Sequence, residues 1–322
     1  MKDTNINILF TNIGRRTYMV QFALDLIKQG YPLKIFVNDT SINTAGFWVS
    51  DIVEHFITPK VENDEQKYID ILFDHCLKNE INVIIPLMDF EIPVLSLKKN
   101  IFKEKNIEVI VSDYETVVNC LDKQKNYEFC ISKNINIPKT VFKKNKDALE
   151  YPLVLKRILG SGSEGQKIIE NEKELVLFRK GRDLLQRFID GKEYGMDILN
   201  DLNGNYLHSF TREKLLMRNG ETDKAKAVFS DKFSNLAKEI SQIFRHVGNM
   251  DIDFIEDIHG EIYFIDFNPR FGGGYPFTHI SGYNYLKTLL DIIIGNPIKF
   301  PNKMDEIIFM KGISIHSYNE AI

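Results

Sequence analysis

Polar side chains that could hold a metal ion recur at every second position late in the chain. The segment "FIDFNPRFGGG", residues 264–274, places Asp266, Asn268 and Arg270 two residues apart within an otherwise apolar run. Because side chains alternate between the two faces of an extended strand, these three would share one face. A carboxylate in such a strand needs a partner, since a buried unpaired charge costs several kcal/mol.

A second acidic segment precedes this one and predicts a hairpin. "DIDFIE" (251–256) and "EIYFIDF" (261–267) are separated by four turn-like residues. If the strands pair symmetrically about this turn, Asp251 faces Asp266, and Asp253 lies one step away on the same face. Mg²⁺ prefers oxygen ligands from one or two carboxylates and from substrate phosphates. The spacing therefore predicts a magnesium site, and the alternative is that Asp266 only pairs with an arginine near the strand end.

A lysine directly before a glycine-rich loop could contact phosphates. In "LKRILGSGSEG", residues 155–165, Lys156 precedes three glycines that would let backbone N–H groups approach phosphate oxygens. The order differs from a Walker P-loop, in which the lysine follows the glycines. A flexible surface turn is the alternative for this segment.

A third segment could form a slot for a nucleotide base. "LLQRFIDGKEYGMDIL", residues 184–199, reads as an apolar strand, a turn at Asp190–Gly191 and a second strand that begins near Glu193. Glu193 would then accept hydrogen bonds from ribose hydroxyls. A surface hairpin with Glu193 in solvent is the alternative.

Taken in order, these segments resemble the ATP-grasp superfamily, particularly its carbamoyl-phosphate-synthase-like carboxylate–amine ligases. The series is "LDKQKN" with Lys123, then Lys156 before its Gly/Ser loop, then "QRFIDGKEYGMDI", then "DIDFIE" and "EIYFIDFNPR". The resemblance covers nearly the whole chain, because the N-terminal part resembles the domain that precedes the ATP-grasp fold. "IDFNPRFGGG" and "GKEYGMDI" are its most specific pieces.

The resemblance implies a role for each matching position. ATP would be bound by Lys123, Lys156, Ser161, Ser163, Gln186, Arg187, Phe188, Ile189 and Glu193, magnesium by Asp253, Asp266 and Asn268, and the transferring phosphoryl group would face the catalytic residues Arg270 and Lys156. Ser161 and Ser163 would belong to a mobile flap. The family often carries glutamate where this chain has Asp266, and glutamate or glutamine at the position of Asp253, so the metal could be displaced slightly.

The implied activity is an ATP-dependent ligase that activates a carboxylate as an acylphosphate and joins it to an amine. The products would be an amide, ADP and phosphate, and the cofactors would be ATP and Mg²⁺, with Mn²⁺ as an alternative metal. Two alternatives keep the ATP site: a phosphoryl-transfer enzyme (a kinase or a carbamoyl-phosphate-type synthase) and a non-catalytic ATP-binding regulator. A Rossmann dinucleotide module with Asp39 on a ribose is disfavoured, because "TNIGRR" lacks the GxGxxG pattern.

Basic residues near predicted turns are candidates for substrate binding. Arg15 and Arg16 follow the first strand at a helix N-terminus, where anions are favoured. Arginine forks suit carboxylates, although a solvated charged face is the simpler explanation for some of these residues. The other candidates are Arg212, Lys214, Arg218 and, after the glycines, His279.

The pattern of apolar segments predicts an α/β unit followed by an α+β unit. Strand-like and helix-like segments alternate up to residue 113, which predicts an open parallel sheet. Beyond it, short paired segments with polar turns predict antiparallel strands. The expected domains are a pre-ATP-grasp domain (1–113), a central ATP-grasp lobe with the flap (114–187) and a C-terminal ATP-grasp lobe with the metal site (188–322).

Composition sets the remaining expectations. The 322 residues have a formal net charge of -4, which does not favour nucleic acid as a partner. The N-terminus lacks a signal-peptide pattern, the apolar stretch "YLKTLLDIIIG" is too short to span a bilayer, and the three cysteines form no CxxC pair. We expect a cytoplasmic protein with small-molecule carboxylate and amine substrates and no membrane partner. The sequence leaves a homodimer open.

Overall fold

An open parallel sheet forms the N-terminal part of the computed structural model, which describes residues 5–143, 150–160, 165–218, 220–302 and 307–318. Its strands lie in the order β3-β2-β1-β4-β5. Their bounds are β1 (Ile6–Thr11), β2 (Leu33–Asp39), β3 (Glu54–Ile57), β4 (Val83–Pro86) and β5 (Glu108–Val109). The predicted parallel sheet is confirmed. Strand β3 was not predicted, because only one of its four residues is buried and it therefore shows no apolar run.

Helices cover both faces of this sheet. Helix α1 (Thr17–Lys28) packs on one face together with the short η1 turn (Ala45–Trp48), and α2 (Glu65–Lys78) and α3 (Ile92–Lys103) pack on the other. The side chains of β1 alternate accordingly: Ile8 and Phe10 face α1, and Leu9 faces α2 and α3. This is the layer order expected of parallel strands joined by helical crossovers.

A curved antiparallel sheet of six strands forms the C-terminal part, in the order β14-β13-β10-β11-β12-β15. Its strands are β10 (Gly191–Asn200), β11 (Tyr206–Arg218), β12 (Glu221–Val228), β13 (Gly248–Asp257), β14 (Ile262–Asn268) and β15 (Ile308–Met310). One face packs on α6 (Asp231–Phe244), α4 (Tyr114–Leu121) and α5 (Lys123–Ser132), and its core includes Met196, Ile252 and Phe267. The opposite face carries the polar residues described below.

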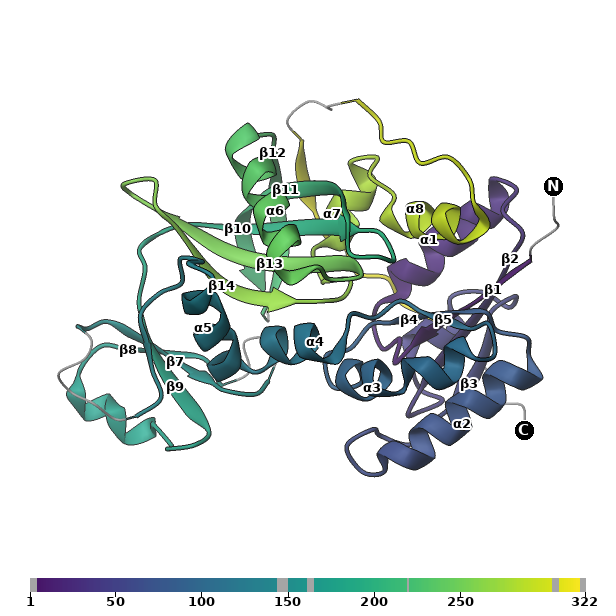
Figure 1. Ribbon diagram of the computed structural model, residues 1–322, viewed down its shortest axis with the longest axis horizontal. Helices are drawn as coiled ribbons and strands as arrows, with labels where there is room; N and C mark the ends of the chain where they lie inside the picture. The colour runs from purple at the N-terminus through teal and green to yellow at the C-terminus, as the bar shows by residue number, and fades with distance from the viewer. Residues whose placement is uncertain (1–4, 144–149, 161–164, 219, 303–306, 319–322) are drawn as a thin grey trace.

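A small sheet lies at the end of the molecule far from the parallel sheet, as Figure 1 shows. It has the order β6-β9-β7-β8, with β6 (Thr140–Val141), β7 (Leu153–Arg157), β8 (Lys167–Ile169) and β9 (Asp183–Arg187). A short η2 helix (Glu172–Leu177) follows β8. The predicted hairpin of β7 and β8 is therefore present, and the chain passes from β9 directly into β10 of the six-stranded sheet.

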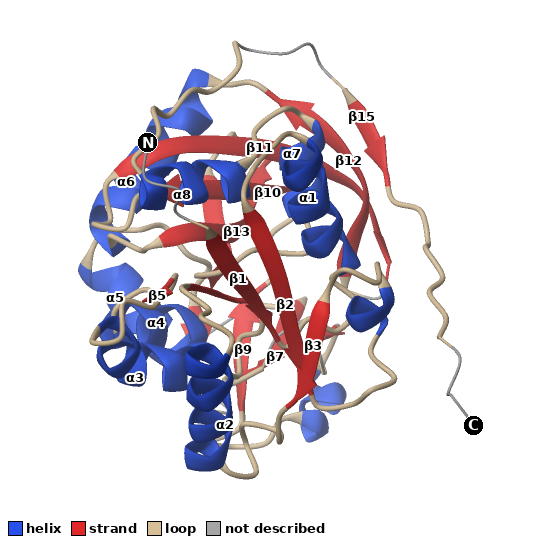
Figure 2. Ribbon diagram, turned by 90° about the vertical axis from the view of Figure 1, so that its right-hand side faces the viewer, coloured by secondary structure: helices blue, strands red, loops and turns tan. Residues whose placement is uncertain are grey.

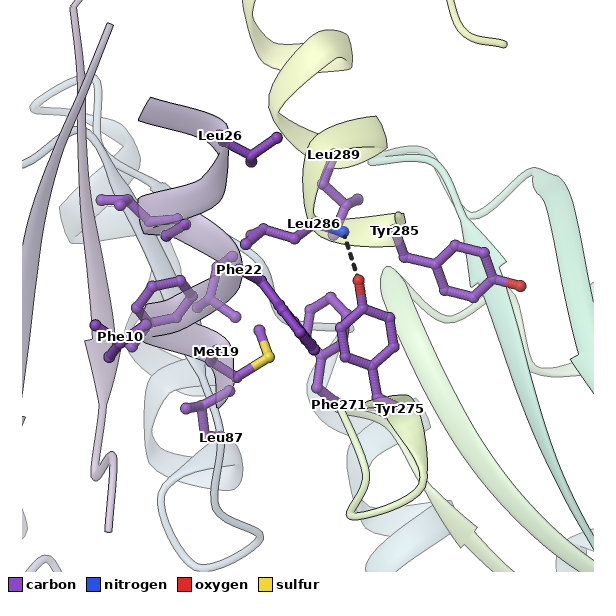
Figure 3. Close-up of a cluster of buried hydrophobic side chains, with 14 of the residues drawn as sticks. Phe10, Met19, Phe22, Leu26, Leu87, Phe271, Tyr275, Tyr285, Leu286 and Leu289 are labelled. Atoms are coloured by element: carbon purple, nitrogen blue, oxygen red, sulfur yellow. Dashed lines mark hydrogen bonds between the residues drawn. The ribbon is translucent and has the colours of Figure 1, made fainter. Parts of the chain in front are cut away.

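The N-terminal and C-terminal parts share one hydrophobic core. Figure 3 shows Met19, Phe22 and Leu26 of α1 packed against side chains from α7 (Tyr275–Ile280) and α8 (Tyr285–Ile294). The hydroxyl of Tyr275 accepts a hydrogen bond from the backbone N–H of Leu286 at 3.1 Å. This shared core fixes the parallel sheet relative to the six-stranded sheet.

The C-terminal segment runs back along the outside of the molecule. After β15 the chain continues without regular structure (Figure 2), and Tyr318 stacks on Trp48 with ring centroids 4.1 Å apart. In the described residues, no helix is both long and apolar enough to cross a membrane. The domain boundaries at residues 113 and 187 stay a prediction.

Candidate active site

A cavity of about 340 Å³ lies where the small sheet meets the six-stranded sheet. Strands β7 and β9 form one wall, and β10, β11, β13 and β14 form the other. The cavity is lined by these residues of the predicted site: Lys123, Lys156, Gln186, Arg187, Phe188, Ile189, Glu193, Asp253 and Asp266. Lys214, predicted as a substrate ligand, also lines it. Segments up to 143 residues apart in sequence therefore meet in one place, which we call the nucleotide cavity.

The connection between the two sheets forms the back of the nucleotide cavity. Strand β9 ends at Arg187 and β10 begins at Gly191, so the short segment between them crosses from one sheet to the other. Gln186 is buried, and its Nε2 donates to Thr140 Oγ1 at 3.0 Å. Apolar side chains from both sheets, including Val154, Met217 and Ile255, complete the wall. A flat aromatic base fits between such walls.

Two carboxylates face each other directly across β13 and β14. Asp253 pairs with Asp266, and Asp251 pairs with Asn268. The predicted register, with Asp251 opposite Asp266, is wrong. An irregularity between the pairs of Asp253 and Phe254 leaves Ile265 as an extra residue on β14, and such a bulge shifts everything beyond it. The bulge brings the two acids closer together than the symmetric hairpin would.

The amide of Asn268 lies beside these acids. Its Nδ2 lies 3.3 Å from the backbone oxygen of Asp251 and 3.4 Å from Asp266 Oδ2. The nitrogen therefore faces protein acceptors, and the amide oxygen is the atom left for a cation. Asn268 itself is buried and does not line the nucleotide cavity.

A third acid, Asp251, does not line the nucleotide cavity and belongs to a buried network of charged side chains. Arg212 donates through Nη2 to Asp251 at 2.6 Å and through Nη1 to Asp197 at 2.7 Å, and its side chain is 1% exposed. The predicted role of Arg212 in substrate binding is therefore not supported, because both terminal nitrogens are bound to buried carboxylates. Within the described residues, no group of three or more His, Cys, Asp and Glu side chains forms a metal cluster.

The three glycines after Arg270 explain how this network fits. A Cβ on Gly272 would overlap the Asp251 carboxylate, and a Cβ on Gly274 would overlap the Arg212 guanidinium. At Gly273 the nearest atom would be the flexible end of Glu221, at 3.4 Å. Two of the three glycines therefore make room for buried side chains.

Lys214 connects two acidic side chains of the nucleotide cavity, Glu193 and Asp253. Its Nζ donates to Glu193 Oε1 at 2.8 Å and lies 2.7 Å from Asp253 Oδ1, and the side chain is 4% exposed. Burial raises the pKa of Asp253 to about 6, and the Lys214 ammonium opposes this rise. The carboxylate thus sits where more positive charge would stabilise it.

Two further lysines line the side of the cavity near the small sheet. Burial lowers the pKa of Lys156 to about 8, partly opposed by Asp266. Lys123 donates to the backbone oxygen of Gly160 at 2.9 Å, and its Nζ lies 3.8 Å from Asp266 Oδ1. Ser161 and Ser163, predicted for the flap, lie outside the described residues.

Arg270 is held by an acid from the parallel sheet. Its Nε and Nη2 donate to the two oxygens of Asp89 at 2.8 and 3.0 Å, and its Nη1 lies 3.7 Å from Asp251 Oδ2. The side chain is 8% exposed and does not line the nucleotide cavity. Asp89 thus connects the two parts of the protein through this ion pair.

The other substrate candidates lie apart from the nucleotide cavity. Arg15 and Arg16 line a second cavity of about 430 Å³ at the carboxyl ends of the parallel strands. The side chain of Arg218 is 65% exposed and lies 3.5 Å from Asp223, so a solvated position describes it better. His279 stacks on Phe22 with ring centroids 3.5 Å apart and lines neither cavity, so its predicted place in the pocket is wrong.

The residues at the nucleotide cavity fit a magnesium–nucleotide. Two carboxylates and one amide oxygen are ligands that Mg²⁺ accepts, and phosphates complete its shell. The raised pKa of Asp253 indicates that this carboxylate would gain from a cation, and the lowered pKa of Lys156 indicates that this ammonium would gain from an anion. The Asp253 carboxylate and the Lys156 ammonium line the same cavity, so one magnesium–nucleotide could supply both the cation and the anion.

Sequence reasoning missed the buried network because its members carry no motif. Asp197 on β10 is its centre. Asn249 on β13 and Thr278 on α7 both donate hydrogen bonds to the Asp197 carboxylate, as Arg212 does. A usable signal was the recurrence of polar residues at every second position in part of β11 (Arg212, Lys214) and of β13 (Asn249, Asp251, Asp253). Those positions mark one polar face of the sheet, opposite the apolar face that packs on α6.

Two family models match the chain. The model described as an ATP-grasp domain matches residues 120–274, and the model described as a PylC-like N-terminal domain matches residues 8–110. The first match contains every described residue of the predicted ATP and metal sites. The second match contains most of the parallel sheet and both candidate arginines of the second cavity.

A curated relative is similar over much of the chain. The small subunit of 2-oxoglutarate carboxylase from Hydrogenobacter thermophilus is 27% identical over 249 residues, which are 66% of this chain and 51% of that protein. The chain thus spans about half the length of this relative. A solved structure of that enzyme's biotin carboxylase domain dimer, in complex with MgADP, ADP and bicarbonate, has a TM-score of 0.69 at 20% identity and covers 91% of this chain and 70% of that one.

Other solved structures share the fold. N5-carboxyaminoimidazole synthetase from Staphylococcus aureus, complexed with ADP, has a TM-score of 0.73 at 18% identity and covers 95% of this chain and 82% of that one. L-amino acid ligase from Bacillus licheniformis has a TM-score of 0.67 at 18% identity, with coverages of 90% and 74%. The likeness extends over nearly all of this chain.

Proposed function

We propose that this chain, which matches the ATP-grasp model over residues 120–274 and the PylC-like N-terminal model over residues 8–110, is an ATP-dependent carboxylate–amine ligase. The observation that carries the proposal is the pair Asp253 and Asp266, which face each other in one cavity with Lys123 and Lys156. Relatives of the same fold were solved with ADP or MgADP, which supports a nucleotide in this cavity.

The first step is activation of the acid. One carboxylate oxygen of the substrate attacks the γ-phosphorus of ATP, the bond to the bridging oxygen breaks, and ADP leaves. The chain's own residues bind and orient: the segment 186–189 holds the adenine, Glu193 the ribose, and Lys123 and Lys156 the phosphates. Asp253, Asp266 and Asn268 would hold Mg²⁺, or Mn²⁺ as an alternative metal, and the bound cation would neutralise charge at the phosphates.

The second step forms the amide. The amine attacks the acyl carbon of the acylphosphate, phosphate leaves with the C–O electron pair, and the nitrogen loses a proton. Water must be excluded from the acylphosphate, and closure of the small sheet over the cavity would do this. We assign the flap to the loop after β7 and divide the chain into units 1–113, 114–187 and 188–322.

Arg270 is assigned a position facing the transferred phosphoryl group through Nη1. Asp89 occupies Nε and Nη2, so that the guanidinium is held in one orientation. An arginine fixed by a bidentate ion pair loses little freedom when it meets an anion. Lys214 is assigned to keep Glu193 and Asp253 in place until the nucleotide arrives.

The test is a screen for ADP release with Mg²⁺ and a library of carboxylates and amines. A ligase releases ADP and phosphate only when an acid and an amine are both present. Release of ADP with one substrate and a stable phosphorylated product would indicate a phosphoryl-transfer enzyme instead. ATP binding without ADP release for any pair of compounds would contradict the proposal and favour a regulator.

A further inference from the structure

A buried guanidinium nitrogen of Arg16, a residue that lines the second cavity, lacks a hydrogen-bond partner among the described residues. This nitrogen is Nη1, and the cavity has a volume of about 430 Å³. A buried donor left unsatisfied destabilises the folded protein, and a charged donor does so more strongly. Burial lowers the pKa of Arg16, which the nearby carboxylates Asp89 and Glu221 only partly oppose. An oxyanion bound at Arg16 would remove both costs.

The place of this cavity in the fold is one where open parallel sheets bind ligands. It is lined by residues that follow β1, β2, β3 and β4, and the order β3-β2-β1-β4-β5 reverses direction at β1. Ligands of such sheets bind outside the carboxyl ends of the strands at this switch point. Pockets for small molecules commonly measure about 300–1,000 Å³. The cavity is large enough for a free amino acid.

The loops around the cavity are held in one conformation. Glu91 is fully buried and accepts from Asn12 Nδ2 at 2.7 Å and from the backbone N–H groups of Leu87 and Met88 at 3.1 and 3.0 Å. Asn12 has a φ of 46°, a left-handed conformation that costs energy unless the surroundings impose it. The carboxylate thus ties the loop after β1 to the loop after β4, so that the cavity walls are fixed before a ligand binds.

The charges that line the cavity identify the kind of ligand. Its cationic side chains are Arg15, Arg16 and Lys60, and its acidic side chains are Asp39, Glu62 and Glu221. A phosphate monoester, with about two negative charges, would favour an excess of cations. Equal numbers of cationic and acidic side chains suit a ligand that carries one positively charged group and one negatively charged group. Met88 and Phe90 supply an apolar surface on the same cavity, where a side chain could lie.

The second cavity is adjacent to the nucleotide cavity. Gly220 lines the nucleotide cavity and its neighbour Glu221 lines the second one. The pKa of Arg16 responds to the charges of Arg270 and Asp89, the pair that adjoins Asp251 and the metal ligands. A substrate in the second cavity therefore reaches toward the phosphates of a nucleotide in the first.

We propose that the second cavity binds a free amino acid as one of the two substrates, with its carboxylate on Arg16, its ammonium near Glu221 and its side chain against Met88 and Phe90. This rests on the proposed ligase function, to which it adds the substrate class. The carboxylate would compensate the charge of the Arg16 guanidinium. Glu221, whose Oε2 lies 3.3 Å from Lys311 Nζ, stands on β12 across the cavity from the loop after β1.

The test is ligand-observed NMR with the twenty common L-amino acids, without nucleotide and then with Mg²⁺ and a non-hydrolysable ATP analogue. Matched probes for each hit are its N-acetyl form, which lacks the ammonium, and the corresponding amine, which lacks the carboxylate. We expect at least one amino acid to bind and both probes to bind about tenfold or more weakly. Inorganic phosphate and ribose 5-phosphate test the rival ligand class.

Variants locate the binding. Arg16→Gln and Glu221→Gln should each weaken amino-acid binding by about tenfold or more, whereas Arg182→Gln, an exposed arginine outside both cavities, should not. Glu221 is exposed, so its variant keeps the test valid if Arg16→Gln fails to fold. Affinity for the ATP analogue should stay unchanged in both variants.

Three results would overturn the inference: no amino acid binds, a phosphate compound binds in an Arg16-dependent way instead, or binding is insensitive to Arg16→Gln. The outcome is separable from that of the proposed function. Amino-acid binding without ADP release for any acid–amine pair would contradict the ligase and leave this site standing. Ligase activity with an acid and an amine of which neither is an amino acid would support the ligase and contradict this site.

Discussion

Two side chains at the nucleotide cavity have electrostatic needs that the protein alone leaves unmet. The carboxylate of Asp253 lacks sufficient positive charge, and the ammonium of Lys156 lacks an anion. Catalytic sites commonly hold such groups, because the bound substrate supplies the missing charge. In the buried network, by contrast, both terminal nitrogens of Arg212 are already paired with the carboxylates of Asp197 and Asp251.

Removing the side chain of Asp266 or of Lys156 should abolish turnover. We expect Asp266→Ala and Lys156→Ala each to lower kcat by about 100-fold or more, because each removes charge stabilisation from the phosphoryl transfer. Circular dichroism and the melting temperature should stay close to those of the wild type, since both side chains are partly exposed. Lys180→Met, at an exposed site away from the cavity, is the control and should be fully active. Full activity in either alanine variant would contradict the assigned role.

The lowered pKa of Lys156 predicts a pH dependence of ATP binding. Without nucleotide this lysine loses its proton as the pH rises through about 8, whereas bound phosphates favour its charged form. Above pH 8 the dissociation constant for MgATP should therefore increase, by up to about tenfold per pH unit. Titrations by calorimetry across this range measure it.

Lys156→Arg is the matched variant for this measurement. A guanidinium stays charged throughout the range, so the pH dependence should disappear in this variant. A wild-type dissociation constant that is the same on both sides of pH 8 would show that Lys156 does not meet the phosphates in its charged form.

At the scale of elements, the segment after β14 is built around buried charge. Asp251, Asp197 and Arg212 come from β13, β10 and β11, and the glycine-rich segment covers them closely. Buried ion networks destabilise a protein strongly when they lose one partner or the space they need. Gly272 and Gly274 lie against this network and Gly273 does not, so substitutions at the three positions can be compared.

Alanine substitutions at these glycines should differ in effect by position. Gly272→Ala and Gly274→Ala should each lower the free energy of unfolding by about 1–3 kcal/mol, because the new methyl group overlaps Asp251 or Arg212. Gly273→Ala should change it little, since Glu221 can move aside. Urea denaturation of the three variants makes the measurement. Equal effects at all three positions would contradict this view of the network.

The order of elements could largely be predicted from apolar periodicity, but register could not. Strands β1, β2 and β4 are buried runs, and α1 and α2 show helical spacing, so local sequence suffices for them. Strand β12 buries mainly Thr222, Ala225 and Ala227, which are too small or polar to mark a strand. The bulge at Ile265 depends on how two strands pair, and no local pattern indicates it.

At the scale of the whole molecule, the two cavities keep their relation through the shared core of α1, α7 and α8. Phe22 lies at its centre, stacked on His279 and edge-on to Tyr275, as Figure 3 shows for Phe22 and Tyr275. The ion pair of Arg270 with Asp89 is a second link between residues 181 apart in sequence. Contacts of such separation explain why the sequence could name site residues but could not say that Arg212 and His279 serve the interior.

Truncation of Phe22 tests whether this core holds the protein together. Phe22→Ala should lower the free energy of unfolding by about 3–5 kcal/mol, because a large buried side chain leaves a cavity at the junction. Chemical denaturation followed by tryptophan fluorescence reports it. Leu97→Ala on α3, where the leucine is 58% exposed, should have little effect. A loss at Phe22 no greater than at Leu97 would mean that the parts are stable without this contact.

The central claim is that acids on β13 and β14 and lysines near the small sheet together bind magnesium–nucleotide. Calorimetric titration of a non-hydrolysable ATP analogue into the protein with Mg²⁺ tests it most directly. The account predicts one site per chain, with binding weakened at least tenfold when Mg²⁺ is omitted or in Asp266→Ala. No detectable binding by the wild type, or equal binding with and without the metal and the Asp266 carboxylate, would contradict it.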